Sequence, residues 1–226
     1  NIKLGVSKYN GILIKPDETF SFNKILGKVD ASTGYLPELV IKANQTIPEY
    51  GGGLCQVSTT AFRAALNSGL PIVERKNHAY PVRYYKWPYP KYGTDATIYL
   101  GGANLRFRND TGYWILIQTR VEGSKLFYDF FGNTDVERRV ELDISEYGYG
   151  WKGSGSLKAT VIYRVYEGDR LIREQKFQSN YKSPNDFPPP GHEEEKEEKK
   201  EEEKEPPPLP PSPPPEEEEN EEQEEG

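Results

Sequence analysis

The stretch Gly51-Gly52-Gly53-Leu54-Cys55-Gln56-Val57-Ser58-Thr59-Thr60 holds the single cysteine of this 226-residue chain. Its three glycines reach backbone angles that other residues avoid, so regular structure is interrupted there. After them, apolar residues recur at the spacing of one helix face: Val57, Ala61, Phe62, Ala65 and Leu66. Asn67-Ser68-Gly69 supplies a stop signal. The pattern predicts a principal helix that begins directly after the glycines, with Cys55 in its first turn.

The predicted position of Cys55 favours a reactive thiolate. The free N–H groups and the dipole at a helix start stabilise negative charge, and the thiolate is the nucleophilic form of cysteine. The N–H groups of Cys55 and Gln56 would also stabilise an oxyanion on an attacked carbonyl. A lone cysteine is otherwise a small buried apolar residue, and this alternative stays open.

A cysteine nucleophile needs a base and a group that orients the base. The chain has two histidines, and His192 sits at the edge of a polar tail, so His78 is the candidate base. We expect one strand over 78–85 and another over 95–100, where Asp95 would accept from the imidazole of His78. The alternatives are a surface position for His78 and a turn role for Asp95.

The predicted catalytic residues are therefore Cys55, His78 and Asp95. The residues predicted to line the oxyanion and substrate site are Gly53, Gln56, Ser58, Thr59, Arg75 and Tyr80. Arg75 enters this set because a planar guanidinium suits a carboxylate. Cysteine at a helix start, histidine on one strand and an acid on the next is an order similar to that of transglutaminase-like and papain-like thiol enzymes.

From Pro71 onward, β-branched and aromatic runs predict strands. They cover 71–75, 78–85, 95–100, 113–121, 125–131, 138–144, 157–166 and 171–178. Turn-like breaks at 109–112, 122–124 and 167–169 favour antiparallel hairpins. Short strands and one irregular helical stretch near 24–25 are expected in the first fifty residues. The fold class is α+β, with one principal helix packed on an antiparallel sheet.

The net charge of −7 combines two unlike parts. Residues 1–192 hold 25 Lys and Arg against 19 Asp and Glu, a charge of +6, whereas residues 193–226 hold 4 Lys against 17 Glu, a charge of −13. The tail has one large apolar residue, Leu209, and cannot bury enough surface to fold. We therefore divide the chain into a catalytic core, 1–132, a β-rich extension of the same domain, 133–188, and a disordered Pro/Glu-rich tail, 189–226.

Several classes are excluded by composition and spacing. A single cysteine and two distant histidines form no local metal site, no glycine motif for phosphates is present, and the +6 charge is dispersed. We therefore expect no metal, no cofactor and no nucleic-acid partner. No apolar run approaches the roughly 20 residues of a membrane helix. The chain lacks methionine, so we expect an export signal, an anchor or another domain before Asn1.

Beyond these local arguments, the chain resembles the VanW family over about 1–132. The resemblance is carried by 51–60, Glu74-Arg75, His78 and Gly93-Thr94-Asp95-Ala96-Thr97, with Pro16-Asp17-Glu18-Thr19-Phe20-Ser21-Phe22-Asn23, Gly34-Tyr35 and Leu105-Arg106-Phe107-Arg108-Asn109. Such proteins are associated with the cell envelope of Gram-positive bacteria, and some are L,D-transpeptidases that form 3-3 peptidoglycan cross-links. The resemblance implies an extracytoplasmic protein, wall-associated or membrane-anchored through a segment before Asn1.

The expected function is peptidoglycan L,D-transpeptidation through a thioester on Cys55. The expected partners are peptidoglycan stem peptides and β-lactams of the carbapenem type, which acylate such thiols, and we expect a monomer. Two alternatives remain. One is a cysteine endopeptidase or carboxypeptidase that uses water as the acceptor, and the other is a peptidoglycan-binding module without catalysis.

Overall fold

The computed structural model describes residues 1–42, 45–86, 88–135, 137–148 and 155–183. The chain divides into two units, Asn1–Pro189 and Pro190–Gly226. All elements described below belong to the first unit. The tail predicted over 189–226 lies outside the described residues. In the described part, no helix has the length and apolarity needed to cross a membrane.

Three helices and eleven strands follow one another in the described residues of the first unit. They are α1 (Ile2–Ser7), β1 (Ile12–Ile14), β2 (Thr19–Ser21), α2 (Phe22–Leu26), β3 (Pro37–Lys42), β4 (Gln45–Tyr50), α3 (Leu54–Asn67), β5 (Ile72–Glu74), β6 (Arg106–Arg108), β7 (Ile115–Glu122), β8 (Lys125–Phe131), β9 (Arg139–Gly148), β10 (Leu157–Glu167) and β11 (Arg170–Tyr181). Two short 3-10 turns cover Ala31–Thr33 and Arg83–Lys86.

The predicted principal helix is confirmed as α3. Gly53 precedes it with φ of 89°, a left-handed angle that favours glycine, and a Cβ there would lie 2.7 Å from Ile2. Gly69 follows it with φ of 71°. All five residues of the predicted apolar stripe are fully buried: Val57, Ala61, Phe62, Ala65 and Leu66. Burial of this stripe makes α3 the centre of the hydrophobic core.

The strands form several small antiparallel sheets instead of one. Their orders are β1-β7-β8, β11-β10-β9, β2-β6-β5 and β3-β4. The predicted hairpins at 122–124 and 167–169 are confirmed by the β7–β8 and β10–β11 pairings. The protein is thus a mixed α+β fold with one main helix, and the expectation of a single principal sheet is wrong.

Two predicted strands are wrong, and both carry candidate site residues. Segment 78–85 is irregular and ends in the turn Arg83–Lys86, because Pro81 has no N–H for a strand ladder. Segment 95–100 pairs with α3 side chains instead of a neighbouring strand. The N–H of Ala96 donates to Thr59, and its carbonyl accepts from Ser58 and Thr59.

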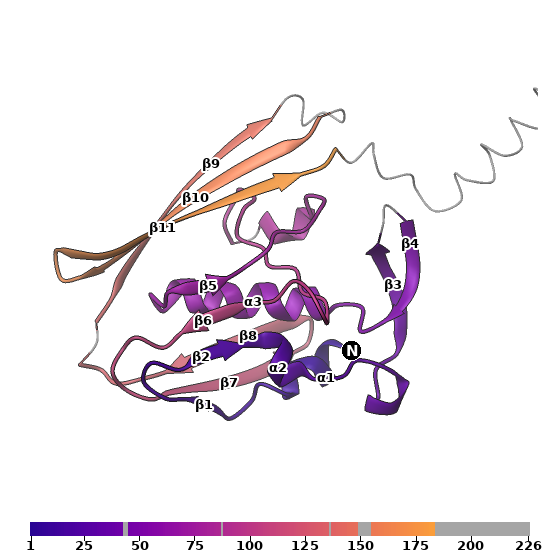
Figure 1. Cartoon of the computed structure of the whole chain (residues 1–226), viewed down its shortest axis with the longest axis horizontal. Helices are drawn as coiled ribbons and strands as arrows, with labels where there is room; N and C mark the ends of the chain where they lie inside the picture. Colours follow the sequence, from indigo (N-terminus) through magenta and orange to yellow (C-terminus); the bar gives the residue numbers. More distant parts are fainter. Residues whose placement is uncertain (43–44, 87, 136, 149–154, 184–226) are drawn as a thin grey trace, which may run out of the picture. The chain divides into compact units, whose positions relative to one another are not determined.

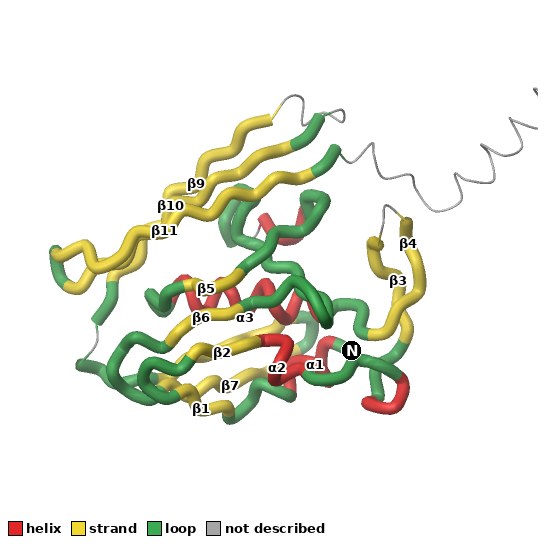
Figure 2. The backbone as a smooth tube through the Cα atoms, in the orientation of Figure 1, coloured by secondary structure: helices red, strands yellow, loops and turns green. Residues whose placement is uncertain are grey.

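The sheet β9–β10–β11 packs on α3 and shares its core (Figures 1 and 2). The Phe62 and Phe177 rings meet edge to face with centroids 5.9 Å apart. The Tyr163 hydroxyl donates to the carbonyl of Leu70 at 3.0 Å. Strands β9, β10 and β11 are therefore built into the same compact unit as the helix that carries Cys55.

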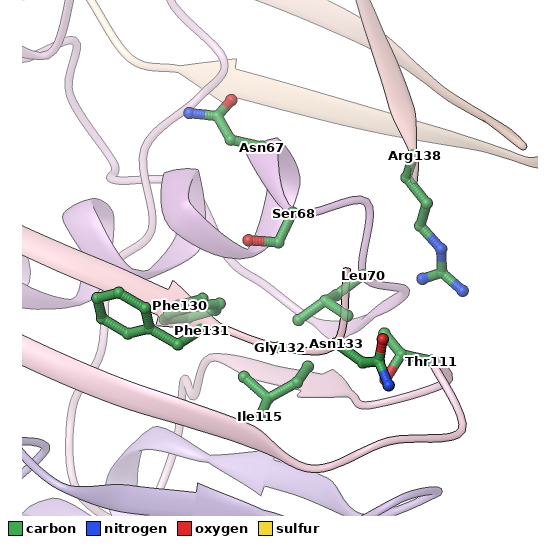
Figure 3. Close-up of a pocket in the computed structure, with 10 residues that line it drawn as sticks. All are labelled: Asn67, Ser68, Leu70, Thr111, Ile115, Phe130, Phe131, Gly132, Asn133 and Arg138. Atoms are coloured by element: carbon green, nitrogen blue, oxygen red, sulfur yellow. The ribbon is translucent and has the colours of Figure 1, made fainter. Parts of the chain in front are cut away.

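Buried charges fasten the C-terminal end of α3 to this sheet. Arg138 and Arg173 both donate to the carbonyl of Gly69, at 3.0 and 2.7 Å, and both pair with the carboxylate of Asp110. A cavity of about 250 Å³ opens beside them, lined by Asn67, Ser68, Leu70 and Arg138 among others (Figure 3). It lies about 18 Å from Cys55, at 1.5 Å per helical residue, so it is separate from the candidate site.

Candidate active site

Cys55 is the second residue of α3, as predicted, and the residue is partly exposed. The Sγ atom lies 3.5 Å from the hydroxyl of Thr97 and 3.7 Å from the carbonyl oxygen of Ile98. The imidazole of His78 forms a hydrogen bond with the same thiol. The thiol therefore lies between the helix start, the histidine and segment 97–98.

His78 is held by Asp95 through two hydrogen bonds to one carboxylate oxygen. Nδ1 of the imidazole lies 2.7 Å from Oδ2 of Asp95, and the backbone N–H of His78 donates to the same oxygen at 2.7 Å. The His78 side chain is 17% exposed, whereas that of Asp95 is 4% exposed. The structure thus brings Cys55, His78 and Asp95 into one relay, although none of the three lies on a strand.

The surroundings of Cys55 and His78 shift the pKa of the thiol down and the pKa of the imidazole up, which favours an ion pair between them. Burial by itself raises the pKa of the Cys55 thiol, but the hydrogen bond and charge of His78 outweigh it and lower that pKa. Burial would lower the pKa of His78, yet its hydrogen bonds with Asp95 and Cys55 raise it to about 9. Both shifts favour a thiolate beside an imidazolium.

Asp95 stays ionised because three donors and a cation surround it. Burial raises its pKa, but the hydrogen bond from His78 and the charge of Arg75 hold that pKa well below its usual range. Arg75 donates to Oδ1 at 3.0 Å, and the buried hydroxyl of Tyr181 donates to the same oxygen. Both oxygens of the carboxylate are therefore occupied, which fixes the orientation that His78 needs.

The N–H groups of the Arg75 guanidinium form hydrogen bonds within the protein. It also reaches the backbone carbonyls of Asp95 and Gly93, at 2.6 and 3.0 Å, and the Ser179 hydroxyl at 2.8 Å. Its side chain is 3% exposed. The carboxylate that Arg75 binds is thus that of Asp95, and the structure places Arg75 behind the relay instead of on a substrate-facing wall.

Ser58 and Thr59 are fully buried on the inner face of α3. Ser58 donates to the Ala96 carbonyl at 2.6 Å, and Thr59 accepts from the Ala96 N–H at 3.1 Å. These bonds hold segment 94–98 against the helix. Both hydroxyls, which we expected in the oxyanion and substrate site, act on the position of Asp95 and Thr97 from within the core.

The helix start offers one backbone donor instead of the expected two. The N–H of Gln56 donates to the Gly53 carbonyl at 3.0 Å, so the expectation that it is free is wrong. No acceptor for the N–H of Cys55 is found in the part of the chain that the structure describes. The Gln56 side chain is only loosely tied to Thr60, at 3.4 Å. The Cys55 N–H and the Gln56 amide are the donors that remain for an oxyanion.

Tyr80 is buried at the junction with the C-terminal sheet. Its ring centroid lies 6.0 Å from Nζ of Lys182, the residue after β11. The backbone N–H of Lys182 donates to the carbonyl of Ala79 at 2.8 Å. Tyr80 thus helps to seat the loop that carries His78.

The sequence did not point to four residues that complete the site. Thr97 contacts the thiol, the ring of Tyr85 lies 5.1 Å from that of His78, and Ser179 and Tyr181 reach in from β11. Burial, with the neighbouring Tyr84 and Cys55, raises the pKa of Tyr85 above its usual range, so its hydroxyl stays protonated. Among the described residues, no group of three His, Cys, Asp or Glu side chains could hold a metal ion.

Replacement of His78 by asparagine tests the ion pair. Without the imidazolium, the pKa of the buried thiol rises, so the pH of half-maximal alkylation by iodoacetamide moves up to the ordinary thiol value of about 8.5 or beyond. The rate at pH 7 then falls roughly tenfold or more, because only a few per cent of a thiol with that pKa is ionised. His192→Asn is the matched control and keeps the wild-type profile. Superimposable profiles for His78→Asn and wild type would rule the pair out.

Replacement of Tyr181 by phenylalanine tests the link between β11 and Asp95. Removing a donor to a buried carboxylate costs about 1.5–3 kcal/mol of unfolding free energy. Tyr163→Phe removes a hydroxyl that donates to the neutral carbonyl of Leu70, and it costs about 1 kcal/mol. Urea unfolding of both variants gives the comparison. A smaller loss for Tyr181→Phe than for Tyr163→Phe would contradict this account of Asp95.

Comparison with known proteins shows the family of the chain. The family described as VanW like protein matches residues 1–131. The vancomycin B-type resistance protein VanW of Enterococcus faecalis is 34% identical over 169 residues, 73% of this chain and 60% of that protein. The uncharacterized protein YoaR of Bacillus subtilis is 34% identical over 140 residues, 62% of this chain and 45% of YoaR. The matched parts span less than two thirds of each relative.

No solved structure matches significantly. The chain belongs to the VanW family.

Proposed function

We propose that this protein is a peptidoglycan L,D-transpeptidase that forms 3-3 cross-links through a thioester on Cys55. The observation that carries the proposal is the relay at the start of α3, formed by the thiol of a partly exposed cysteine, an imidazole and a buried carboxylate. A paired thiolate of this kind suits acyl transfer. Membership in a family with a relative named for vancomycin resistance supports a role in the cell wall.

In the acylation step, the Cys55 thiolate attacks the carbonyl carbon that joins the third residue of a tetrapeptide stem to its terminal D-Ala. The carbonyl π electrons move to oxygen, and the N–H of Cys55 and the Gln56 amide stabilise the oxyanion. When the intermediate collapses, the C–N bond breaks and the imidazolium of His78 gives its proton to the departing amine. The products are free D-Ala and a thioester on Cys55.

In the second step, an amine on the side chain of another stem attacks the thioester carbonyl. His78 is now neutral and takes a proton from this amine, and the C–S bond breaks to restore the thiolate. The new amide joins two stems through their third residues. Asp95 remains ionised in both steps and keeps Nδ1 of His78 protonated, so that the other ring nitrogen faces the thiol.

The charge of residues 1–192 suits an anionic wall. Residues 1–192 carry +6, which attracts an anionic polymer over about 8 Å at physiological salt. We place the protein outside the cytoplasm, in the wall or anchored at the membrane. Carbapenem β-lactams belong to the proposed ligands, because a thiolate opens their strained ring and keeps the acyl group.

Two other functions use the same residues differently. A cysteine endopeptidase or carboxypeptidase would let water resolve the thioester and release a trimmed stem. A binding module would hold the stem without attacking it. The lowered pKa of the Cys55 thiol favours a catalytic function over the binding module.

The test combines intact-protein mass spectrometry with product analysis. The full chain is incubated with a purified disaccharide-tetrapeptide, with and without excess acceptor, and separately with a carbapenem. We expect a thioester adduct of the donor minus D-Ala, a carbapenem adduct and a 3-3 cross-linked dimer. Cys55→Ala abolishes both adducts and lowers dimer formation by several orders of magnitude. Asn67→Ala, at the other end of α3, keeps wild-type rates.

The products separate the candidates. A cross-linked dimer supports the transpeptidase, whereas trimmed tripeptide without dimer assigns the hydrolase. Full dimer formation by Cys55→Ala would overturn the cysteine mechanism. Binding of the donor without any adduct or product would identify a binding module.

A further inference from the structure

We propose that Tyr99 determines substrate specificity at this site. Its ring packs against a side chain of the donor stem, that of the residue whose carbonyl carbon Cys55 attacks. The inference rests on the proposed function and names the part of the donor stem that the protein recognises. It is carried by the position, the exposure and the support of one aromatic ring.

Tyr99 continues the row of residues that face the site. Asp95 forms a hydrogen bond with His78, and the Thr97 hydroxyl lies 3.5 Å from the Cys55 sulfur. The residues between and after them, Ala96 and Ile98, belong to the hydrophobic core. This alternation places Tyr99 on the same side as Asp95 and Thr97. It is two residues beyond Thr97, hence within about 7 Å of it along an extended chain.

The ring of Tyr99 is exposed but well supported. The residue is 54% exposed. Its ring lies directly on Gly102, where a Cβ would come within 1.8 Å of it, so only glycine allows this packing. The turn is closed by bonds from the Tyr99 N–H to Ala103 and from the Gly102 N–H to Tyr99, at 3.0 and 3.2 Å.

Asn23 fixes the same turn from outside. Its side-chain amide donates to the carbonyls of Tyr99 and Ala103, at 3.1 and 3.0 Å, and its backbone N–H donates to Asn104 at 3.0 Å. An aromatic ring that is held in place loses little entropy when a ligand packs on it. The turn therefore presents a preorganised apolar surface beside the nucleophile.

The chemistry decides which part of the substrate reaches this surface. His78 must deliver its proton to the leaving amine, so the leaving D-Ala lies toward His78 and Asp95. The acyl residue then extends to the opposite end of the row, toward Tyr99. In a 3-3 cross-link this residue carries a long aliphatic side chain ending in an amine, and its methylenes and ammonium both suit the face of a tyrosine ring.

The test compares two synthetic tetrapeptide donors that end in D-Ala and carry Lys or Ala as the third residue. Acylation of Cys55 in the full chain is followed by intact mass to give kcat/KM for each donor. We expect wild type to prefer the Lys donor roughly tenfold and Tyr99→Ala to lose this preference. Tyr99→Phe retains the ring and the preference. Tyr147→Ala, an exposed tyrosine of β9, behaves as wild type.

A second readout separates this role from a general defect. The rate of Cys55 alkylation by iodoacetamide stays at the wild-type value in Tyr99→Ala, because the relay is intact. If Tyr99→Ala keeps the preference for Lys while wild type is acylated, the inference on Tyr99 is wrong and the proposed function stands. If wild type is acylated by neither donor, both fall. Slower alkylation in Tyr99→Ala would assign Tyr99 to the support of the thiol instead.

Discussion

The carboxylate of Asp95 is the interaction on which the site depends. It is almost completely buried, and a buried charge is tolerated only when donors satisfy it. Arg75 supplies the countercharge, and His78 and Tyr181 supply hydrogen bonds. Because Asp95 is held ionised, His78 keeps a raised pKa, and because His78 is charged, the Cys55 thiol loses its proton more readily. The pKa of the Cys55 thiol thus depends on Asp95 through His78.

The C-terminal sheet contributes two residues to this arrangement. Ser179 and Tyr181 lie near the end of β11, and both reach the Arg75–Asp95 pair. The match to the family ends at residue 131. The acid end of the relay therefore draws on residues outside the region that defines the family.

Local patterns in the sequence predicted the parts of the fold that local forces determine. The apolar stripe of α3 and the glycines around it identified the helix, and the turn residues identified the hairpins. The predicted strand at 78–85 was wrong because Pro81 cannot donate to a strand ladder. The predicted strand at 95–100 was wrong because side chains of α3, not a neighbouring strand, bond the backbone of Ala96. Cys55, His78 and Asp95 could still be named from residue type and order. Tyr181 could not, because it reaches Asp95 across 86 positions and no local pattern marks it.

The protonation state of His78 at neutral pH tests the central claim most directly. Because the chain has two histidines, the variant His192→Gln leaves His78 as its single imidazole. Nitrogen-15 NMR of this variant then reports both ring nitrogens without overlap. The account predicts that both nitrogens carry protons at pH 7, as in an imidazolium paired with the Cys55 thiolate. A ring with one unprotonated nitrogen at pH 7 would contradict it.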